Sequence, residues 1–199
     1  MNSLVRYRIG EASSLELLVG DITHEETDAI VNAANSSLLG GGGVDGAIHR
    51  AAGPALLAEC RKVRDQRGSL PPGQVVITGA GRLKVRYVIH TVGPVWNGGT
   101  INEPQILESC YCNSIHEANK HGCLSVAFPS ISTGAFGYPV EPAAKIALRA
   151  VTGLLHGAGS VKLVRFVLFD PATHRAYTQA AGELSSVFPS LRIFAETLS

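Results

Sequence analysis

Short apolar runs that alternate with helical patterns constrain this sequence more than any other feature. The runs are rich in Val, Ile and Leu, and between them apolar residues recur three and four positions apart. This alternation predicts an α/β fold with a largely parallel central sheet. We expect strands at 15–19, 29–31, 75–78, 85–90, 125–129 and 164–169, with a short edge strand near 7–9.

Helical spacing of apolar residues places helices between these runs. The pair Gly53-Pro54 predicts a break between two of them, because Pro is tolerated in the first turn of a helix. The stretch 64–73 carries charges, glycine and two prolines, so we expect a surface connection there. Helices are expected within 44–52, from Pro54 through Cys60, and within 106–115 and 143–154.

Length and composition bound the class of protein. The chain has 199 residues, of which 45% are hydrophobic and 17% charged, and a formal net charge of +1. These values suit one globular domain, 1–199, and exclude a disordered or polycationic chain. No stripe of Lys and Arg stands out, which argues against nucleic-acid binding. No window approaches the ~18 uninterrupted apolar residues of a membrane span, so we expect a cytoplasmic protein without membrane contact.

Cysteine spacing and familiar catalytic patterns give no sign of a metal or cofactor. Cys60, Cys110, Cys112 and Cys123 form no CxxC pair. We expect buried free thiols rather than zinc ligands or disulfides. No metal-ligand cluster, Ser-His-Asp arrangement or phosphate-binding Gly-Lys-Ser/Thr loop is present. The sequence therefore calls for no metal and no cofactor.

The segment 32–53 holds four consecutive glycines, Gly40 to Gly43, between an apolar run and a helix start. Glycines let a backbone come close to a ligand and leave its N–H groups uncovered. Where such a loop runs into a helix, the free N–H groups of the first turn and the positive end of the dipole make an anion site. We interpret this loop as a phosphate cradle.

A second glycine-containing loop, 132–137, follows the expected strand 125–129. It offers hydroxyl and backbone N–H groups of the kind that bind phosphate, although its glycines also fit a plain turn. In an open α/β sheet, ligands bind in loops beyond the carboxyl ends of strands. Since both glycine loops follow strands, together they are suited to grip a diphosphate from two sides.

Asp45 and its neighbours are the candidate reacting groups. An acid beside a phosphate weakens anion binding, so Asp45 suggests work on a water or a ribose hydroxyl; in the other interpretation it only complements the helix dipole. Asn35 fits either orienting that sugar or water, or closing an Asx turn. For His49, on the same helix face, we expect a structural hydrogen bond, with acid–base help as the alternative. His90 lies in an apolar strand and is expected to be a hydrogen-bonded core histidine.

Two further residues follow strands directly. Asp21 fits either a helix cap or an acceptor for the amino group of a purine. Phe169 ends a strand and fits either the core or a flat face that stacks on a base. The two interpretations of each residue remain open at this point.

Five motifs follow one another along the chain: Val19-Gly20-Asp21-Ile22-Thr23, Asp28 to Asn35, Gly40 to Gly53, His90-Thr91-Val92-Gly93-Pro94 and Pro129 to Pro139. With these motifs in this order, the sequence resembles the macrodomain family, and its MacroD-type branch in particular. The resemblance covers nearly the whole chain. It implies a three-layer α/β/α sandwich with a mixed, largely parallel central sheet that binds ADP-ribose.

The resemblance also implies roles for single residues. Asn35 would contact the distal ribose, and Asp45 would position or activate the attacking water. Asp21 would bind the adenine amino group, with Phe169 beside the base. Phe136 stands where many relatives carry Tyr, so it lacks the hydroxyl for a hydrogen bond to that ribose. The implied ligand contacts are Asp21, Ile22, Ala33, Gly41, Gly42, Gly43, Val44, Ser132, Thr133, Gly134, Ala135, Phe136 and Phe169.

MacroD-type relatives remove mono-ADP-ribose from acidic protein side chains and deacetylate O-acetyl-ADP-ribose. Both reactions release an ester attached to the distal ribose. The resemblance therefore implies a hydrolase that acts on ADP-ribosylated proteins or O-acetyl-ADP-ribose and binds ADP-ribose. A non-catalytic reader of ADP-ribosylated partners, or a phosphatase of ADP-ribose 1″-phosphate, would use the same pocket. The acid Asp45, ten residues after Asn35, favours the hydrolase over the reader.

Overall fold

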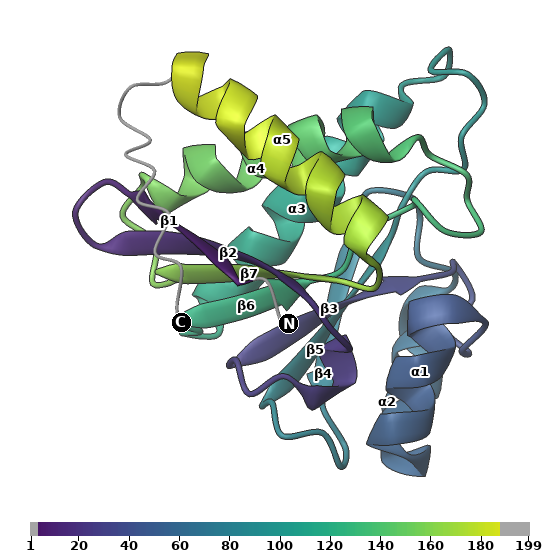
Figure 1. Cartoon of the computed structure of the whole chain (residues 1–199). Coiled ribbons are helices and arrows are strands. Elements are labelled where there is room, and N and C mark those ends of the chain that lie inside the picture. The colour runs from purple at the N-terminus through teal and green to yellow at the C-terminus, as the bar shows by residue number, and fades with distance from the viewer. Residues whose placement is uncertain (1–3, 188–199) are drawn as a thin grey trace.

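A computed structural model describes residues 4–187 of the chain. Within this range seven strands form one sheet, and five α-helices and a short 3₁₀ helix connect them (Figure 1). The predicted domain 1–199 extends beyond the described residues at both ends. The elements are β1 (Val5–Ile9), β2 (Ser13–Val19), η1 (Ile22–His24), β3 (Ala29–Ala34), α1 (Gly43–Ala52), α2 (Pro54–Arg67), β4 (Val75–Gly79), β5 (Tyr87–Val92), α3 (Glu103–Lys120), β6 (Ser125–Phe128), α4 (Val140–Leu155), β7 (Leu163–Leu168) and α5 (Pro171–Val187).

The sheet is mixed and largely parallel, as predicted. Its strand order is β1-β2-β7-β6-β3-β5-β4. The five central strands run parallel, while β1 and β4 pair antiparallel at the two edges. Helical crossovers allow parallel neighbours, whereas the short turn between β1 and β2 forces an antiparallel pair. All five central strands therefore end at the same edge of the sheet.

Helices cover both faces of the sheet, which confirms the three-layer α/β/α sandwich (Figure 1). Alternation along β3 divides its side chains between two cores. Ala29 and Val31 face α3, α4 and α5, whereas Ile30 and Ala34 face α1 and α2. Asn32 shares the second face, where it is fully buried.

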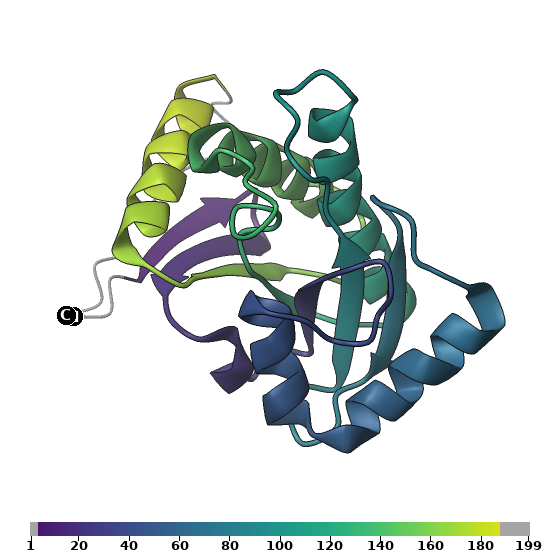
Figure 2. The same ribbon diagram turned by 90° about the vertical axis from the view of Figure 1, so that its right-hand side faces the viewer.

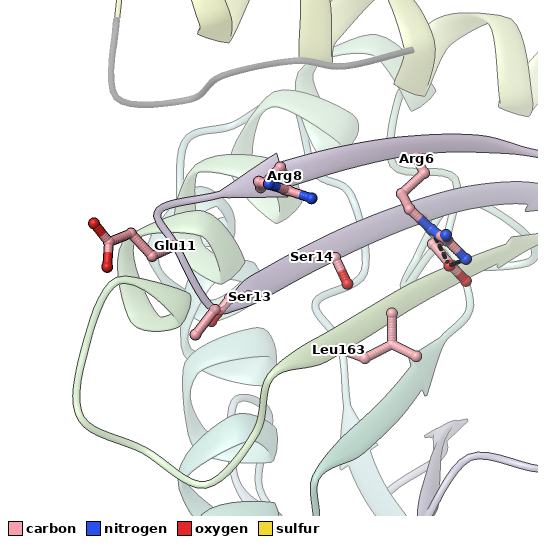
Figure 3. Close-up of a pocket in the computed structure, with 8 residues that line it drawn as sticks. Arg6, Arg8, Glu11, Ser13, Ser14 and Leu163 are labelled. Atoms are coloured by element: carbon pink, nitrogen blue, oxygen red, sulfur yellow. Dashed lines mark hydrogen bonds and ion pairs between the residues drawn. The ribbon is translucent and has the colours of Figure 1, made fainter. Parts of the chain in front are cut away.

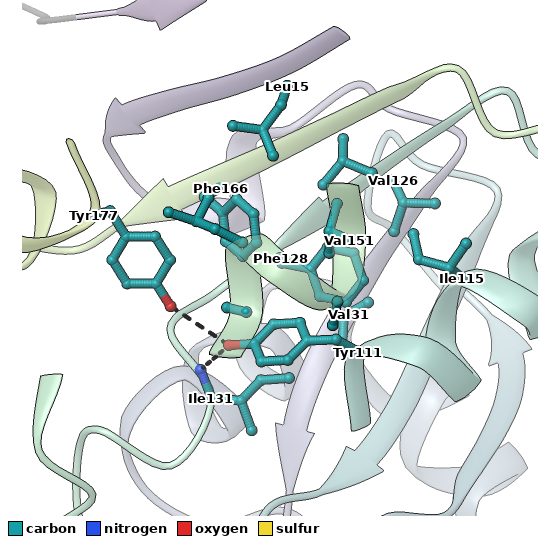
Figure 4. Close-up of a cluster of buried hydrophobic side chains, with 14 of the residues drawn as sticks. Leu15, Val31, Tyr111, Ile115, Val126, Phe128, Ile131, Val151, Phe166 and Tyr177 are labelled. Carbon is teal, nitrogen blue, oxygen red and sulfur yellow. Dashed lines mark hydrogen bonds between the residues drawn. The ribbon is translucent and has the colours of Figure 1, made fainter. Parts of the chain in front are cut away.

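The core under α3 to α5 is rich in aromatic rings (Figure 4). Phe166 lies at its centre, with ring centroids of Phe128, Tyr111 and Tyr177 between 5.1 and 6.0 Å away. Such ring pairs add to the stabilisation from area burial alone. The Tyr111 hydroxyl also accepts a hydrogen bond from the backbone N–H of Ile131 at 3.1 Å. A core side chain thus fixes the loop that follows β6.

Several predicted boundaries differ from those of the structure, and three of the differences are instructive. Strand β5 begins at Tyr87 instead of 85, because the N–H groups of Arg86 and Tyr87 both donate to the carbonyl of Asp28. Strand β3 continues to Ala34, past the polar Asn32. The expected connection 64–73 starts later, since α2 runs to Arg67 and ends at Gly68, whose φ is +79°.

The cysteines are free, as expected. Cys60, Cys110 and Cys123 are buried, whereas Cys112 is half-buried. Burial raises the pKa of both the Cys60 and the Cys110 thiol to about 11. Among residues 4–187 no group of three His, Cys, Asp or Glu side chains could hold a metal ion. In the same part of the chain, no helix is both long and apolar enough to cross a bilayer.

Candidate active site

The loops singled out in the sequence gather at the carboxyl edge of the parallel strands. The loop 35–42 follows β3, and the loop 129–139 follows β6, the strand beside it (Figure 2). Asp21 and Phe169 follow β2 and β7, which are also neighbours. The prediction that one edge collects these loops is confirmed. This is the position at which open α/β sheets bind their ligands.

Asn35 shapes the loop 35–42 from within. Its Oδ1 accepts hydrogen bonds from the backbone N–H and the hydroxyl of Ser37, and its Nδ2 donates to the carbonyl of Gly40 at 2.9 Å. These contacts form an Asx turn, one of the two roles considered for Asn35. The turn leads the chain through Leu38, which has a φ of +58° and a buried side chain. Contact of Asn35 with a ribose remains a prediction.

The glycines after Asn35 leave the start of α1 open. No side chain caps this ten-residue helix, whose N-cap is Gly42. A Cβ on Gly42 or Gly43 would meet nothing within 4 Å. A Cβ on Gly41, in contrast, would lie 3.1 Å from both Asn35 Nδ2 and Asp45 Oδ2. The N–H groups of the first turn therefore have no side-chain cap, and Asp45 Oδ2 lies close to Gly41 in the loop.

Asp45 is buried in the first turn of α1. Its Oδ1 accepts a hydrogen bond from Asn32 Nδ2 at 2.7 Å and lies 3.5 Å from Nε2 of His49. Burial raises the pKa of the Asp45 carboxyl; the hydrogen bond from Asn32 and the charge of His49 only partly offset this rise. The site thus holds a carboxylate that is a stronger base than an exposed aspartate.

Buried polar atoms without partners gather around this carboxylate. They are Asp45 Oδ2, His49 Nε2 and Asn32 Oδ1. The structural hydrogen bond expected for His49 is therefore absent at Nε2, which faces Asp45 instead. His90 meets the expectation for it, since it is fully buried and hydrogen-bonded. Buried polar atoms are rarely left unpaired, so the cluster is arranged to receive a polar ligand or water.

The loop 129–139 presents backbone N–H groups to the same edge. Ser132 has a φ of +66° and a buried hydroxyl without a partner. Gly134 and Ala135 are exposed, and within residues 4–187 no hydrogen bond to their N–H groups is present. A Cβ on Gly93 would lie 2.1 Å from Ser132 Oγ, so only glycine at 93 admits this conformation. The loop has the open donors that a phosphate group requires.

Sequence reasoning missed the segment that supports this loop. The N–H of Trp96 donates to the carbonyl of Phe136 at 2.8 Å, and the Trp96 ring lies 4.5 Å from that of Tyr138. The carboxylate of Glu103 accepts from three backbone N–H groups of this segment, those of Asn97, Gly99 and Ile101. The signal available in the sequence was an acid, Glu103, shortly after the pair Gly98-Gly99.

Asp21 and Phe169 have different surroundings. Asp21 caps η1 by accepting hydrogen bonds from the N–H and hydroxyl of Thr23 at 2.9 and 2.7 Å. Partial burial acts to raise the pKa of Asp21, but these bonds and the charge of His24 hold it below its usual range. Phe169 is 87% exposed and has no place in the core, so its ring face is free. An ionised acceptor and an open ring therefore stand at adjacent strand ends.

Ile22 and Ala33 expose little side chain at this edge. Ile22 is buried against α1 and α2, and Ala33 packs partly against the opposite core. Because its side chain is buried, any ligand contact of Ile22 would use its backbone. The remaining candidates lie in the two loops described above and at the start of α1: Gly41 and Gly42 in the first loop, Gly43 and Val44 in the first turn of α1, and Ser132, Thr133, Gly134, Ala135 and Phe136 in the second loop.

A pocket of about 560 Å³ lies elsewhere, against β1 and the starts of β2 and β7 (Figure 3). Ser13, Ser14 and Leu163 place it at the opposite edge of the sheet from the glycine loops. The buried Glu16 beside it is paired with Arg6 and Arg165. This pocket is therefore separate from the candidate site.

Fold and site together define the class of protein. A family model described as Macro domain matches residues 31–147. The chain belongs to this family. A macro domain-containing protein from Caldanaerobacter subterraneus subsp. tengcongensis is 55% identical over 170 residues, 85% of this chain and 97% of the relative. An O-acetyl-ADP-ribose deacetylase from Klebsiella pneumoniae is 57% identical over 162 residues, 81% of this chain and 93% of the relative.

Solved structures agree with this assignment. The Oceanobacillus iheyensis macrodomain with ADP superimposes with a TM-score of 0.88 and 43% identity, and the match covers 93% of this chain and 99% of that one. The Trypanosoma brucei macrodomain in complex with ADP-ribose gives a TM-score of 0.77 and 40% identity, covering 84% and 69% of the two chains. The macrodomain fold expected from the sequence is confirmed.

Proposed function

We propose that this protein binds ADP-ribose at the carboxyl edge of its sheet and hydrolyses esters on the distal ribose. The substrates are O-acetyl-ADP-ribose and mono-ADP-ribose linked to acidic side chains of proteins. The observation that carries this proposal is the buried Asp45, with its raised pKa and unpaired Oδ2 beneath the open glycine loop. Relatives named O-acetyl-ADP-ribose deacetylase, and solved macrodomains with ADP or ADP-ribose, support it.

Binding energy in this proposal comes mainly from the ADP part. The start of α1 and the loop 129–139 supply N–H donors to the diphosphate from neighbouring strands. Asp21 accepts from the adenine amino group, and Phe169 offers a ring face to the base. Because the ester is remote from these contacts, they serve to hold it in a fixed position over Asp45.

The chemical step needs a water beside Asp45 Oδ2. The water oxygen attacks the ester carbonyl carbon, and its proton passes to Asp45 or to a phosphate oxygen of the substrate. The tetrahedral intermediate then collapses, the bond to the ribose oxygen breaks, and that oxygen takes up a proton. The products are a carboxylic acid and ADP-ribose. General-base assistance of this kind is worth about 10²–10⁴-fold in rate.

A non-catalytic reader is the second candidate, because the glycine loops alone suffice to bind ADP-ribose. The buried carboxylate argues against it: burying an acid without full pairing costs stability and repels the diphosphate. A reader gains nothing from that cost. A phosphatase acting on ADP-ribose 1″-phosphate is less favoured, since the acid would repel the extra phosphate as well.

The test compares wild type with Asp45→Ala. Acetate release from O-acetyl-ADP-ribose and ADP-ribose release from a protein modified on Glu or Asp are followed, with calorimetric titration of ADP-ribose into both proteins. We expect the variant to bind ADP-ribose and to turn over about 10²-fold or more slowly. Binding without hydrolysis of either ester by the wild type would make the protein a reader. Equal turnover by the two proteins would remove Asp45 from the mechanism.

A further inference from the structure

A row of buried polar side chains crosses the sheet behind Asp45. Asn32 lies in β3, His90 in β5 and Thr78 in β4, on three adjacent strands. Asn32 and His90 are direct register partners and are both fully buried. All three lie on the face that packs against α1 and α2, where their neighbours in these strands are apolar. A polar row in such a place is costly unless its members satisfy one another.

The hydrogen bonds of this row run in one direction. The Thr78 hydroxyl donates to the carbonyl of Gly79 at 3.0 Å, so its oxygen accepts from His90 Nε2 at 2.9 Å. Nε2 thus carries the ring proton, and Nδ1 accepts from Asn32 Nδ2 at 3.1 Å. Burial lowers the pKa of His90 to about 3, so the ring stays neutral.

This direction fixes the amide of Asn32. Its Nδ2 has two protons, of which one goes to His90 and the other to Asp45 Oδ1 at 2.7 Å. Turning the amide over would place Oδ1 against the Asp45 carboxylate and the His90 lone pair, both acceptors. Asn32 therefore holds Asp45 by Oδ1 and leaves Oδ2 unpaired, next to the position that a Cβ on Gly41 would occupy.

We propose that His90 and Thr78 are positioning residues, which act through Asn32 to aim Asp45 Oδ2 at the substrate water. The inference rests on the proposed hydrolysis for its catalytic consequence, but the orientation of Asp45 does not depend on it. Neither His90 nor Thr78 touches the substrate. Each fixes the hydrogen-bond direction of the next side chain, and the last of these is the Asp45 carboxylate.

Other titratable groups around Asp45 have to be considered with this row. His49 faces it from α1 at 3.5 Å, and Cys60 of α2 lies near enough for the Asp45 charge to raise the pKa of the thiol further, beyond the larger effect of burial. Cys60 Sγ is also 3.7 Å from His90 Nε2. With its pKa at about 11 the thiol stays neutral near pH 7, so among these two neighbours only the charge of His49 acts on Asp45, whose pKa it lowers.

Two pairs of variants test the proposal. His90→Leu removes the acceptor for Asn32, whereas His90→Asn restores a carbonyl oxygen near the position of Nδ1. Thr78→Val removes the hydroxyl without a change of shape. Thr91→Val is its matched control, since Thr91 is also a buried sheet threonine that donates to a carbonyl at 3.0 Å but lies on the other face. Melting temperatures identify any variant that fails to fold.

The first readout is the titration of the Asp45 carboxyl, followed by ¹³C NMR in the free protein. In His90→Leu the Asn32 amide loses its second acceptor and is held less firmly, so its hydrogen bond to Asp45 weakens. A hydrogen bond to a charged group is worth about one to two pKa units, and we therefore expect this variant to raise the Asp45 pKa by about one unit. Thr78→Val should shift it less in the same direction, while His90→Asn and Thr91→Val leave it near the wild-type value. An unchanged Asp45 titration in both His90→Leu and Thr78→Val would overturn the proposal.

The second readout is the pH dependence of ester hydrolysis. In His90→Leu the acid limb of the kcat–pH profile should shift to higher pH by the same amount as the Asp45 pKa. On the plateau of the profile, kcat should fall about 10-fold, while the Kd of ADP-ribose stays within about 3-fold of wild type. An equal loss in kcat and ADP-ribose affinity would indicate a merely structural role. If the wild type hydrolyses neither ester, the proposed function fails, and the NMR titration still decides the orientation of Asp45.

Discussion

Replacing Gly41 with Ala tests whether the space between Asn35 and Asp45 is used in the reaction. The added Cβ would lie 3.1 Å from Asn35 Nδ2 and from Asp45 Oδ2, whereas ordinary contacts of a Cβ begin near 3.4 Å. Both groups must therefore retreat by a few tenths of an ångström. A misplacement of about 1 Å costs about 10²-fold in rate, so this smaller shift should lower kcat about 10-fold. The methyl group also keeps water away from Oδ2.

The assay is acetate release from O-acetyl-ADP-ribose, with calorimetric titration of ADP-ribose and thermal unfolding of each variant. Gly153→Ala is the control, because Gly153 lies exposed in α4 and its Cβ would meet nothing within 4 Å. We expect the control to keep wild-type turnover and to gain about 1 kcal/mol in stability from helix propensity. Wild-type kcat in Gly41→Ala would refute the argument that the reacting water lies beside Asp45 Oδ2 in the space under Gly41.

Four further outcomes are expected. Tyr111→Phe removes the acceptor for the Ile131 N–H and should lower the free energy of unfolding in urea by about 1–3 kcal/mol; an unchanged midpoint would contradict this. Phe169→Ala should weaken ADP-ribose binding about 10-fold, the worth of one base stacked on an aromatic ring, without a change in melting temperature, since the ring is 87% exposed. Folding raises the pKa of Asp45, so the ionised carboxylate destabilises the folded protein at pH values above its folded pKa. Asp45→Asn should therefore melt at a higher temperature than wild type at pH 7. The difference should vanish below about pH 3.9, where the aspartate is protonated in the unfolded chain as well. Cys60, with its pKa raised to about 11, should resist alkylation by iodoacetamide at pH 8 in the native protein; rapid labelling would show that α2 opens.

Local patterns in the sequence were enough to predict the α/β class and the largely parallel sheet, whereas the three layers were predicted from the family resemblance. Each run of Val, Ile and Leu forms a strand because these side chains pack on a pleated, buried surface. The prediction failed where a polar residue is buried in the core. The polar Asn32 led us to end the predicted strand at 31, yet β3 continues to Ala34. A helix end was missed for the opposite reason, since the charged residues up to Arg67 also favour a helix.

The candidate site was predictable to the level of its loops and not to the level of its hydrogen bonds. Asp45 and the glycines before it could be placed because a strand, a glycine loop and a helix follow one another in the sequence. The contact between Asn32 and His90 joins residues 58 positions apart through the register of β3 and β5. No local pattern contains that register. The same limit left both roles of Asn35 open until the Asx turn was seen.

The two glycine loops belong to different halves of the molecule's interior. Loop 35–42 and α1 rest on the apolar layer under α2, whereas loop 129–139 is tied through Ile131 to Tyr111 in the aromatic layer on the far side of the sheet. A diphosphate held by both would join these layers as a removable cross-link. Its binding energy would then stabilise both layers against opening, and amide exchange should become slower in both. In the proposed binding mode adenosine would contact only the ends of β2 and β7, so we expect adenosine alone to leave amide exchange in both layers unchanged.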